Sequence, residues 1–442
     1  MNSHILSMQQ PISENRYGIR GMHLLEADRE IADAALVVDG GKIQWCGDSQ
    51  QIPASFLKDS ILWVDASGTL VTPGFVNHHS HVSMGYLRGL GLTESDLVFD
   101  LMFETEKKLD QSLTEALAYS SLVDGLKSGI TTFYDHYYGS LGVARACETL
   151  GVRAWVGETV GDLGTAFPDE ASFEKVKSVL NQWKFSDRVR PFVAPHAANT
   201  VSTKLMRDLA QLSKSDQLPI HLHLSQSEKE FEFTQSEYGR TPVQWVADCG
   251  ALSEQSLVVH MVYLTDSDVS ILKQSGATVG FCPSAQVIAE RLAPIDRFYD
   301  SQIPVALGTD CAVTNDRMDI VSEMKTSLLF LMDRLGREKG DPKWVFKSAT
   351  SIAQTVFGEK RLGSLKAGCF ADFVIFQKDI TTLPIQKAYE SLILSFGRSQ
   401  VQHVCVDGNF VVWNQKLSQV DENDLKENYQ KAVAEIWSRQ SH

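Results

Sequence analysis

The sequence has few of the features that mark a membrane-bound, secreted or nucleic-acid-binding protein. It contains no run of about 18 or more apolar residues, so no membrane-spanning helix is expected. The N-terminal segment lacks a basic start followed by an apolar stretch, so a secretory signal peptide is not expected either. Positive charge is scarce, because 41 lysines and arginines against 55 aspartates and glutamates leave a formal net charge of −14. Phosphate-rich partners need a basic surface, which argues against a nucleic acid or an anionic membrane as a partner.

Cysteine is sparse and follows no pattern that would bridge the chain or bind a metal. The seven cysteines are scattered through 442 residues, odd in number and free of any C-x-x-C pair. This pattern gives neither a disulfide framework nor zinc-finger spacing, and it fits reduced thiols in a cytoplasmic protein. Hydrophobic residues make up 43% of the chain, which is ordinary for a globular protein. The length predicts one large domain together with a smaller one.

Short apolar, β-branched segments alternate with helical-period segments through the middle of the chain. The intervening stretches, such as 113–129 and 203–216, repeat their apolar residues at helical spacing. Strands that alternate with helices of this length predict parallel βαβ units, and eight strands predict an α/β protein with a (β/α)₈ TIM-like barrel. The active site of such a barrel lies at the carboxyl ends of its strands. The expected strands are 71–81, 131–137, 152–160, 189–196, 219–225, 257–262, 277–283 and 303–310.

The two ends of the chain have a different character. Residues 15–66 and 363–413 contain short alternating strands separated by glycine-containing turn signals. Because the two ends resemble each other, we expect them to pair into one small β-sandwich domain beside the barrel. The expected division is a small domain with a C-terminal helix, residues 1–67 and 363–442, and a barrel domain, residues 68–362.

Histidine is concentrated at the ends of the expected strands. His79 and His81 form an H-x-H at the end of the first strand, and His221 and His223 repeat it at the fifth. Residues i and i+2 of a strand point to the same face, so both rings of a pair can aim into the barrel mouth. Asp310 ends the eighth strand and offers a carboxylate oxygen. One such pair alone is more often part of the core, but two pairs and an aspartate at one rim predict an open, catalytic metal site.

Seven segments occur in an order and spacing that carry a family resemblance. The chain resembles the amidohydrolase superfamily, in particular its branch of hydrolytic deaminases and triazine chlorohydrolases. That branch includes methylthioadenosine/S-adenosylhomocysteine deaminases and guanine deaminases. The resemblance implies a barrel hydrolase with a flanking β-domain and one divalent metal ion, zinc in first place and iron as the alternative. The segments are PGFVNHHSHV (73–82), APHAANTVS (194–202), IHLHLSQSEKE (220–230), VVHMVYLTD (258–266), FCPSAQ (281–286), ALGTDCAVTND (306–316) and GSLKAGCFADFVIF (363–376).

Taken residue by residue, the resemblance also implies roles. Asp310 would bind the metal and take a proton from the water. His260, at the end of the sixth strand, would hydrogen-bond the attacking hydroxide and the tetrahedral centre. His196 matches a position that contacts the substrate ring, and His221 would orient a neighbouring ligand. The implied metal ligands are His79, His81, His223 and Asp310.

One departure from the family pattern affects the acid–base chemistry. In the family's deaminases a glutamate follows the third histidine ligand by three residues, whereas this chain has Gln226. A neutral amide forms hydrogen bonds but carries no proton at ordinary pH. In one interpretation Asp310 and His260 perform the proton transfers while Gln226 orients the substrate. In a second, Glu228 or Glu230 substitutes for the missing glutamate. In a third, hydrolysis is lost or very slow.

Further departures concern the substrate. Asn199 stands at a position where the family's related segment has tyrosine, and Cys311 follows Asp310 where glycine is usual. Glu106 lies in an insertion at 90–109 and either matches the ribose-binding glutamate of the nucleoside deaminases or is a solvated helix residue. The expected substrate-binding residues are His196, Asn199 and Glu106. Because the departures cluster around the pocket, the resemblance does not fix an adenosine-type substrate.

The sequence therefore predicts a metal-dependent hydrolase that removes an amino group from an aromatic nitrogen heterocycle of the purine, pterin, pyrimidine or triazine type. One alternative is chlorohydrolase-type removal of another leaving group, since halide departure needs no protonation. A second alternative is a non-catalytic relative that binds metal and ligand, for which Gln226 is the support. The expected partner is a small heterocyclic substrate. Homo-oligomerisation is compatible with the sequence, because homo-oligomers are common among soluble proteins.

Overall fold

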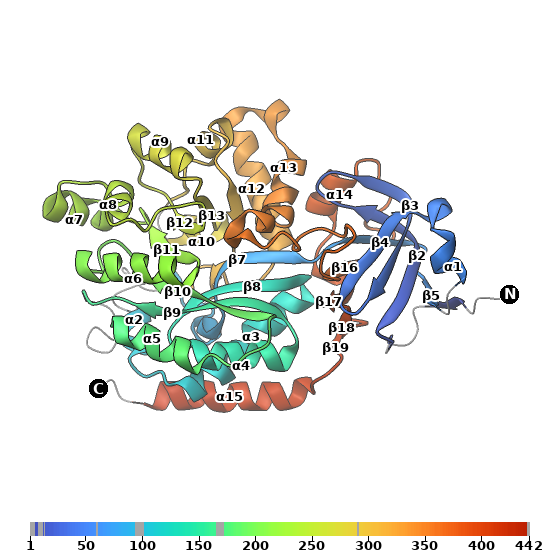
Figure 1. Ribbon diagram of the computed structural model, residues 1–442, viewed down its shortest axis with the longest axis horizontal. Helices are drawn as coiled ribbons and strands as arrows, with labels where there is room; N and C mark the ends of the chain where they lie inside the picture. The colour runs from blue at the N-terminus through green and yellow to red at the C-terminus, as the bar shows by residue number, and fades with distance from the viewer. Residues whose placement is uncertain are drawn as a thin grey trace.

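The computed structural model describes residues 5–7, 12, 14–58, 61–92, 101–164, 172–289 and 291–439. It contains a parallel barrel, surrounded by helices, and a mixed sheet that lies beside it (Figure 1). Among these residues, no helix combines the length and the apolar character needed to cross a bilayer.

The barrel is a ring of parallel strands arranged in chain order, as the sequence predicted. The last strand, β15, pairs with the first, β7, at Asp310–Ser80 and Cys311–His81, and this pairing closes the ring. All carboxyl ends of such a ring meet at one rim. The strands are β7 (Phe75–His81), β8 (Ile130–Tyr137), β9 (Arg153–Val160), β10 (Val189–Pro195), β11 (Ile220–Leu224), β12 (Ser256–His260), β13 (Thr278–Phe281), β14 (Val305–Leu307) and β15 (Asp310–Cys311).

Two of the expected strands are interrupted at glycines. The segment expected as one strand at 71–81 divides at Gly74, where a Cβ atom would lie 2.1 Å from the hydroxyl oxygen of Thr131. The eighth strand divides into β14 and β15 at Gly308, where a Cβ atom would lie 2.8 Å from the Cβ atom of His79. Only glycine permits such close approaches. The close approach at Gly308 brings the backbone just before Asp310 against His79, a predicted metal ligand.

Amphipathic helices cover the outside of the barrel, and polar residues cap their first turns. For α3 (Gln111–Lys127), the carboxylate of Asp110 accepts hydrogen bonds from the backbone N–H groups of Ser112 and Leu113, both at 2.9 Å. Such caps satisfy donors that the helix itself leaves free. The other main helices of this layer are α4 (Ser140–Leu150), α5 (Phe173–Gln182), α6 (Thr203–Asp216), α8 (Pro242–Asp248), α9 (Asp266–Ser275), α11 (Ile295–Asp300), α12 (Ile320–Leu335) and α13 (Pro342–Ser348).

The two chain ends form the mixed sheet together, as expected from their patterns. Strand β6 from the first part of the chain pairs antiparallel with β16 from the last part, with Val71 opposite Ile375. The limits at 67/68 and 362/363 remain predictions. Along the sheet the strands are β1 (Ile5–Ser7), β5 (Leu62–Asp65), β2 (Arg16–Leu25), β6 (Thr69–Pro73), β16 (Phe373–Gln377), β17 (Val401–Val406), β18 (Asn409–Trp413) and β19 (Lys416–Leu417). In addition, β3 (Glu30–Asp39) pairs with β2, and β4 (Lys42–Asp48) pairs with β3.

The C-terminal helix α15 (Glu422–Ser438) lies on the barrel side of the molecule, along α3 (Figure 1). Its buried residues Ala432 and Ile436 join an apolar cluster that includes Leu113 and Leu117 of α3. The helix therefore packs on the barrel layer, although it follows the last strands of the mixed sheet in sequence.

Candidate metal centre

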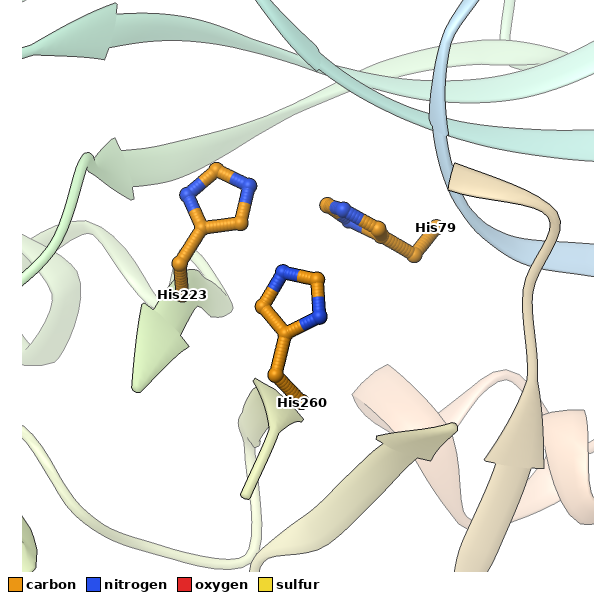
Figure 2. A group of neighbouring side chains, drawn as sticks. All are labelled: His79, His223 and His260. Atoms are coloured by element: carbon orange, nitrogen blue, oxygen red, sulfur yellow. The ribbon is translucent and has the colours of Figure 1, made fainter. Parts of the chain in front are cut away.

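The carboxyl rim of the barrel gathers histidines from four strands and one loop, together with an aspartate from a fifth strand. The rings of His79, His223 and His260, on β7, β11 and β12, face a common space (Figure 2). His136, which our sequence analysis did not single out, lies at the same rim, with its ring 4.6 Å from that of His223 between centroids. The residues brought together are His79, His81, His136, His196, His221, His223, His260 and Asp310.

His81 and His223 face each other through ring nitrogens that carry no proton. Nδ1 of His81 donates to the backbone carbonyl of His136, and Nδ1 of His223 donates to that of His196 at 2.8 Å. A carbonyl oxygen only accepts, so each neutral ring keeps a lone pair on Nε2. Burial lowers the pKa of His81 to about 3 and that of His223 to about 4, which keeps both rings neutral.

The two Nε2 atoms of His81 and His223 lie 3.3 Å apart. Two lone pairs at this distance repel each other unless a cation lies between them or beside them. The donor set around them is therefore chemically suited to a divalent metal ion, which neutral imidazoles and carboxylates bind readily.

His79 and Asp310 complete this donor set. Nδ1 of His79 and Nε2 of His221 are 2.9 Å apart, whereas Nε2 of His79 is buried and has no hydrogen-bond partner among the described residues. That nitrogen lies 3.7 Å from Oδ1 of Asp310, and Nε2 of His81 lies 3.5 Å from the same oxygen. The potential ligand atoms of His79, His81 and Asp310 all lie within 4.8 Å of one another.

His260 lies near the second carboxylate oxygen of Asp310. Its Nε2 is 4.0 Å from Oδ2 of Asp310, and with His79 and His223 it forms a second group whose ligand atoms lie within 4.8 Å. The side-chain amide of Gln286 donates to the backbone carbonyl of His260 at 2.9 Å. This bond holds the end of β12, so the His260 ring faces the same space as the carboxylate.

A cavity of about 450 Å³ opens over the histidines. Its size lies within the range of roughly 300–1,000 Å³ that is usual for small-molecule sites. The three residues predicted to bind substrate, His196, Asn199 and Glu106, all line it, as does Gln226. Aromatic and apolar side chains form much of the remaining wall, among them Met84, Phe103, Tyr137, Tyr138, Val262 and Ile288.

Glu106 is buried, so the interpretation of Glu106 as a solvated helix residue is wrong. It ends the short helix α2 (Phe103–Glu106), is 4% exposed, and lines the cavity. Its Oε2 atom has no hydrogen-bond partner in the part of the chain that the structure describes. Burial raises the pKa of Glu106 to about 8. A sequence pattern could not show this burial, because a neighbouring side chain, Tyr137, comes from another element, β8.

The carboxylates near Gln226 are placed differently from each other. Glu230 is buried, and its two oxygens accept hydrogen bonds from the backbone N–H groups of Gln226 at 2.7 Å and Ala198 at 3.4 Å. Glu230 therefore ties the loop after β11 to the loop after β10. Glu228 is exposed at the cavity mouth.

Comparison with known proteins gives matches over most of the chain. Residues 70–411 match the family model described as the amidohydrolase family. A 5'-deoxyadenosine deaminase from Methanosphaera stadtmanae is 30% identical, covering 82% of this chain and 86% of that protein. A 5-methylthioadenosine/S-adenosylhomocysteine deaminase from Thermodesulfovibrio yellowstonii is 29% identical, covering 92% and 95%. A zinc-bound adenosine deaminase from Xanthomonas campestris has the same fold, with a TM-score of 0.88 at 23% identity over 96% of this chain and 99% of that one.

Proposed function

Because the chain belongs to the amidohydrolase family, we propose that it is a metal-dependent hydrolase that removes an amino group from an aromatic nitrogen heterocycle. The observation that carries the proposal is the pair of unprotonated Nε2 atoms of His81 and His223, 3.3 Å apart beside Asp310 at the floor of a cavity. A binding module without chemistry has no need of such an open donor set, whereas a hydrolase does.

We assign His79, His81, His223 and Asp310 as the ligands of one divalent ion, with zinc as the favoured metal and iron as the alternative. The zinc-bound relative supports this choice of metal. A divalent metal held there supplies Lewis acidity and lowers the pKa of water at the site. His221 orients His79 through their 2.9 Å contact, as the two backbone carbonyls orient the other histidines.

Asp310 and His260 are the residues best placed for the proton transfers. Oδ2 of Asp310 accepts the proton of the attacking water and passes it to the leaving amine. His260, 4.0 Å away, donates a hydrogen bond from Nε2 to the oxygen that forms at the attacked carbon. Gln226 lines the same cavity and offers its amide to the ring of the substrate, since it cannot carry a proton. Glu230 is occupied by two backbone amides, which favours a structural role for it.

The substrate is proposed to lie between the metal site and Glu106. His196 and Asn199 contact the heterocycle on one wall of the cavity. Glu106, buried with one oxygen unpaired, binds a hydroxyl or amine substituent that can form a hydrogen bond with it. The curated relatives are named as deaminases of adenosine derivatives, which makes a substituted purine the first class to test. The seven free cysteines support a cytoplasmic location.

The experiment that tests this function is turnover of a panel of aminated and halogenated purines, pterins, pyrimidines and triazines by the zinc-loaded protein. Ammonia and chloride are followed separately, with Asp310→Asn as the inactive control and Gln226→Glu alongside. Ammonia release that is lost on metal removal and in Asp310→Asn is the expected result. Chloride release without ammonia would instead establish the chlorohydrolase alternative. Silence of the wild type combined with activity of Gln226→Glu would mean that the protein is a non-catalytic relative.

A further inference from the structure

His136 lies among the proposed metal ligands, yet both of its ring nitrogens are already hydrogen-bonded within the protein. Nε2 lies 3.2 Å from the backbone carbonyl of Pro195, and Nδ1 lies 2.9 Å from the hydroxyl of Thr159. A carbonyl oxygen only accepts, so Nε2 carries the proton and donates it to Pro195. Nδ1 then accepts from the Thr159 hydroxyl. The tautomer of the neutral ring is therefore fixed by its partners.

The backbone on either side of this ring orients two of the proposed metal ligands. The carbonyl of His136 accepts the hydrogen bond from Nδ1 of His81. Pro195, which accepts from the His136 ring, directly precedes His196, whose carbonyl accepts from Nδ1 of His223 at 2.8 Å. The His136 imidazole thus links two segments of the backbone. One contains the carbonyl that orients His81, and the other contains Pro195 and, one residue later, the carbonyl that orients His223.

The connection spans a neighbouring strand. His136 is on β8 and Pro195 ends β10, and β9 lies between these two strands in the barrel. Thr159, near the end of β9, donates to the ring from this intervening strand. The ring is buried, so water does not compete for these bonds. Three consecutive strand ends are joined through one side chain.

We propose that His136 is a positioning residue that joins the ends of β8, β9 and β10 and so holds Nε2 of His81 and Nε2 of His223 at a spacing that a single divalent metal can bridge. The proposal rests on the metal site proposed above. Two facing lone pairs 3.3 Å apart repel each other before the metal binds, so the scaffold has to hold the rings against that repulsion. Partners in the outer shell of a metal site typically change metal affinity by about 10- to 100-fold.

A role for His136 as a metal ligand is the competing interpretation. Potential ligand atoms of His81, His136 and His223 do lie within 4.8 Å of one another. Coordination through Nδ1 would, however, displace the Thr159 hydroxyl, and coordination through Nε2 would remove the proton given to Pro195. The two interpretations make opposite predictions for a variant that lacks the Thr159 hydroxyl.

The test is Co²⁺ binding to metal-free protein, followed by titration and by the visible ligand-field spectrum. His136→Phe keeps an aromatic ring but removes both hydrogen bonds, so we expect about 10- to 100-fold weaker Co²⁺ binding and an altered spectrum. Thr159→Val removes one bond and should weaken binding less. His136→Gln can still donate to Pro195 and should recover part of the affinity. The Tm of each metal-free variant is measured in parallel.

His403 provides the matched control. It is a buried histidine of the mixed sheet, and its ring lies against that of Trp413 with ring centroids 4.0 Å apart. His403→Phe should alter neither the Co²⁺ affinity nor the spectrum under the proposal, whatever it does to Tm. Equal losses of affinity in His403→Phe and His136→Phe would overturn the positioning role, because general destabilisation would then explain both.

Three other outcomes are decisive. Unchanged Co²⁺ affinity and spectrum in His136→Phe would overturn the positioning role and leave the proposed function intact. Tighter Co²⁺ binding by Thr159→Val, together with a spectrum of His136→Phe that indicates one nitrogen ligand fewer, would show that His136 is a ligand. That result would also overturn the positioning role. Failure of the wild type to bind Co²⁺ or Zn²⁺ would overturn the metal site itself, and with it the proposed function.

Discussion

At the scale of single residues, two residues whose side chains turn into the site have strained backbones. His260 has φ of +81° and Asp310 has φ of +63°, values that few residues other than glycine adopt. Each such residue costs about 1–3 kcal/mol and persists only where its surroundings enforce it. Here the backbone N–H of Cys311 donates to Oδ1 of Asp310 at 2.7 Å, and Gln286 holds the carbonyl of His260. The strain is consistent with a site in which both side chains must face the same space.

Glu106, again a single residue, makes the folding stability of the protein depend on pH. Its pKa is raised from 4.5 to about 8 by burial, so the folded protein binds this proton more tightly than the unfolded chain does. Its contribution to stability is therefore greatest below pH 4.5 and is lost as the pH rises towards 8. Glu106→Gln cannot ionise, so the variant should be more stable than the wild type at pH 8.5 and about equally stable at pH 4.5.

Thermal unfolding of both proteins across this pH range measures the effect as a difference in Tm. The same variant should bind a hydroxyl- or amine-bearing substrate more weakly, since the carboxyl group is proposed to contact that substituent. A Tm difference that does not change with pH would show that Glu106 keeps an ordinary pKa in the folded protein.

At the scale of secondary-structure elements, helix α15 supports the wall of the cavity. The ring of Trp437 meets that of Tyr86 edge-on at 6.1 Å between centroids. The hydroxyl of Tyr86 donates to Oγ1 of Thr105 at 3.1 Å, one residue before Glu106. Ile436 belongs to the same apolar cluster as Phe103. A helix at the end of the chain thus reaches the substrate wall through two aromatic rings.

Trp437→Ala should therefore raise KM more than it lowers kcat. An aromatic pair contributes about 0.5–1.5 kcal/mol, and its loss frees Tyr86 and the segment that carries Glu106. Steady-state kinetics on a substrate from the panel measure the effect. Leu329 on α12 is the control, since it is a comparably exposed apolar residue, 51% against 45% for Trp437. Leu329→Ala should change neither constant, and equal effects in both variants would contradict the supporting role of α15.

At the scale of the whole molecule, a buried arginine joins the barrel to the mixed sheet. Arg153 begins β9, at the end of the strand opposite the metal site. It donates from Nε and Nη2 to the two carboxylate oxygens of Asp372, at 2.8 and 3.2 Å, and from Nη2 to Asp407 at 3.3 Å. Its guanidinium carbon lies 3.6 Å from the centre of the Phe370 ring. The two parts are therefore connected by a bidentate, buried ion pair.

Arg153→Met should lower the stability of the protein by about 3–5 kcal/mol, because it leaves the Asp372 carboxylate buried without its partner. Chemical denaturation measures this loss. The Co²⁺ affinity of the folded variant should stay at the wild-type value, because the pair lies at the far end of the barrel from the ligands. Arg240, an exposed arginine that pairs with the exposed Asp248, is the control, and Arg240→Met should cost much less. A loss of Co²⁺ affinity in Arg153→Met would show that the small domain controls the metal site.

Much of this arrangement follows from local sequence pattern. The i, i+2 spacing of His79 and His81 puts both rings on one face of a strand, whatever surrounds them. Successive βαβ units place every strand end at one rim, so residues as far apart as His223 and Asp310 could be expected to meet there. The alternating segments at both chain ends similarly predicted a shared β-domain. These features depend on periodicity and chain order, which can be read directly from the sequence.

Other features depend on contacts between distant segments, and only the tertiary structure decided them. Carbonyl groups on β8 and after β10 determine which ring nitrogen of His81 and of His223 carries the proton. No sequence pattern shows which backbone carbonyl will accept such a hydrogen bond. His136 ends a strand without a second histidine two residues away, so its place among the ligands became visible only when β8 and β11 were brought together. The sequence left open whether Glu106 is solvated, and its burial beside Tyr137 of β8 was decided by the tertiary structure. The sequence thus determined which groups reach the rim, whereas packing decided their protonation, their burial and their partners.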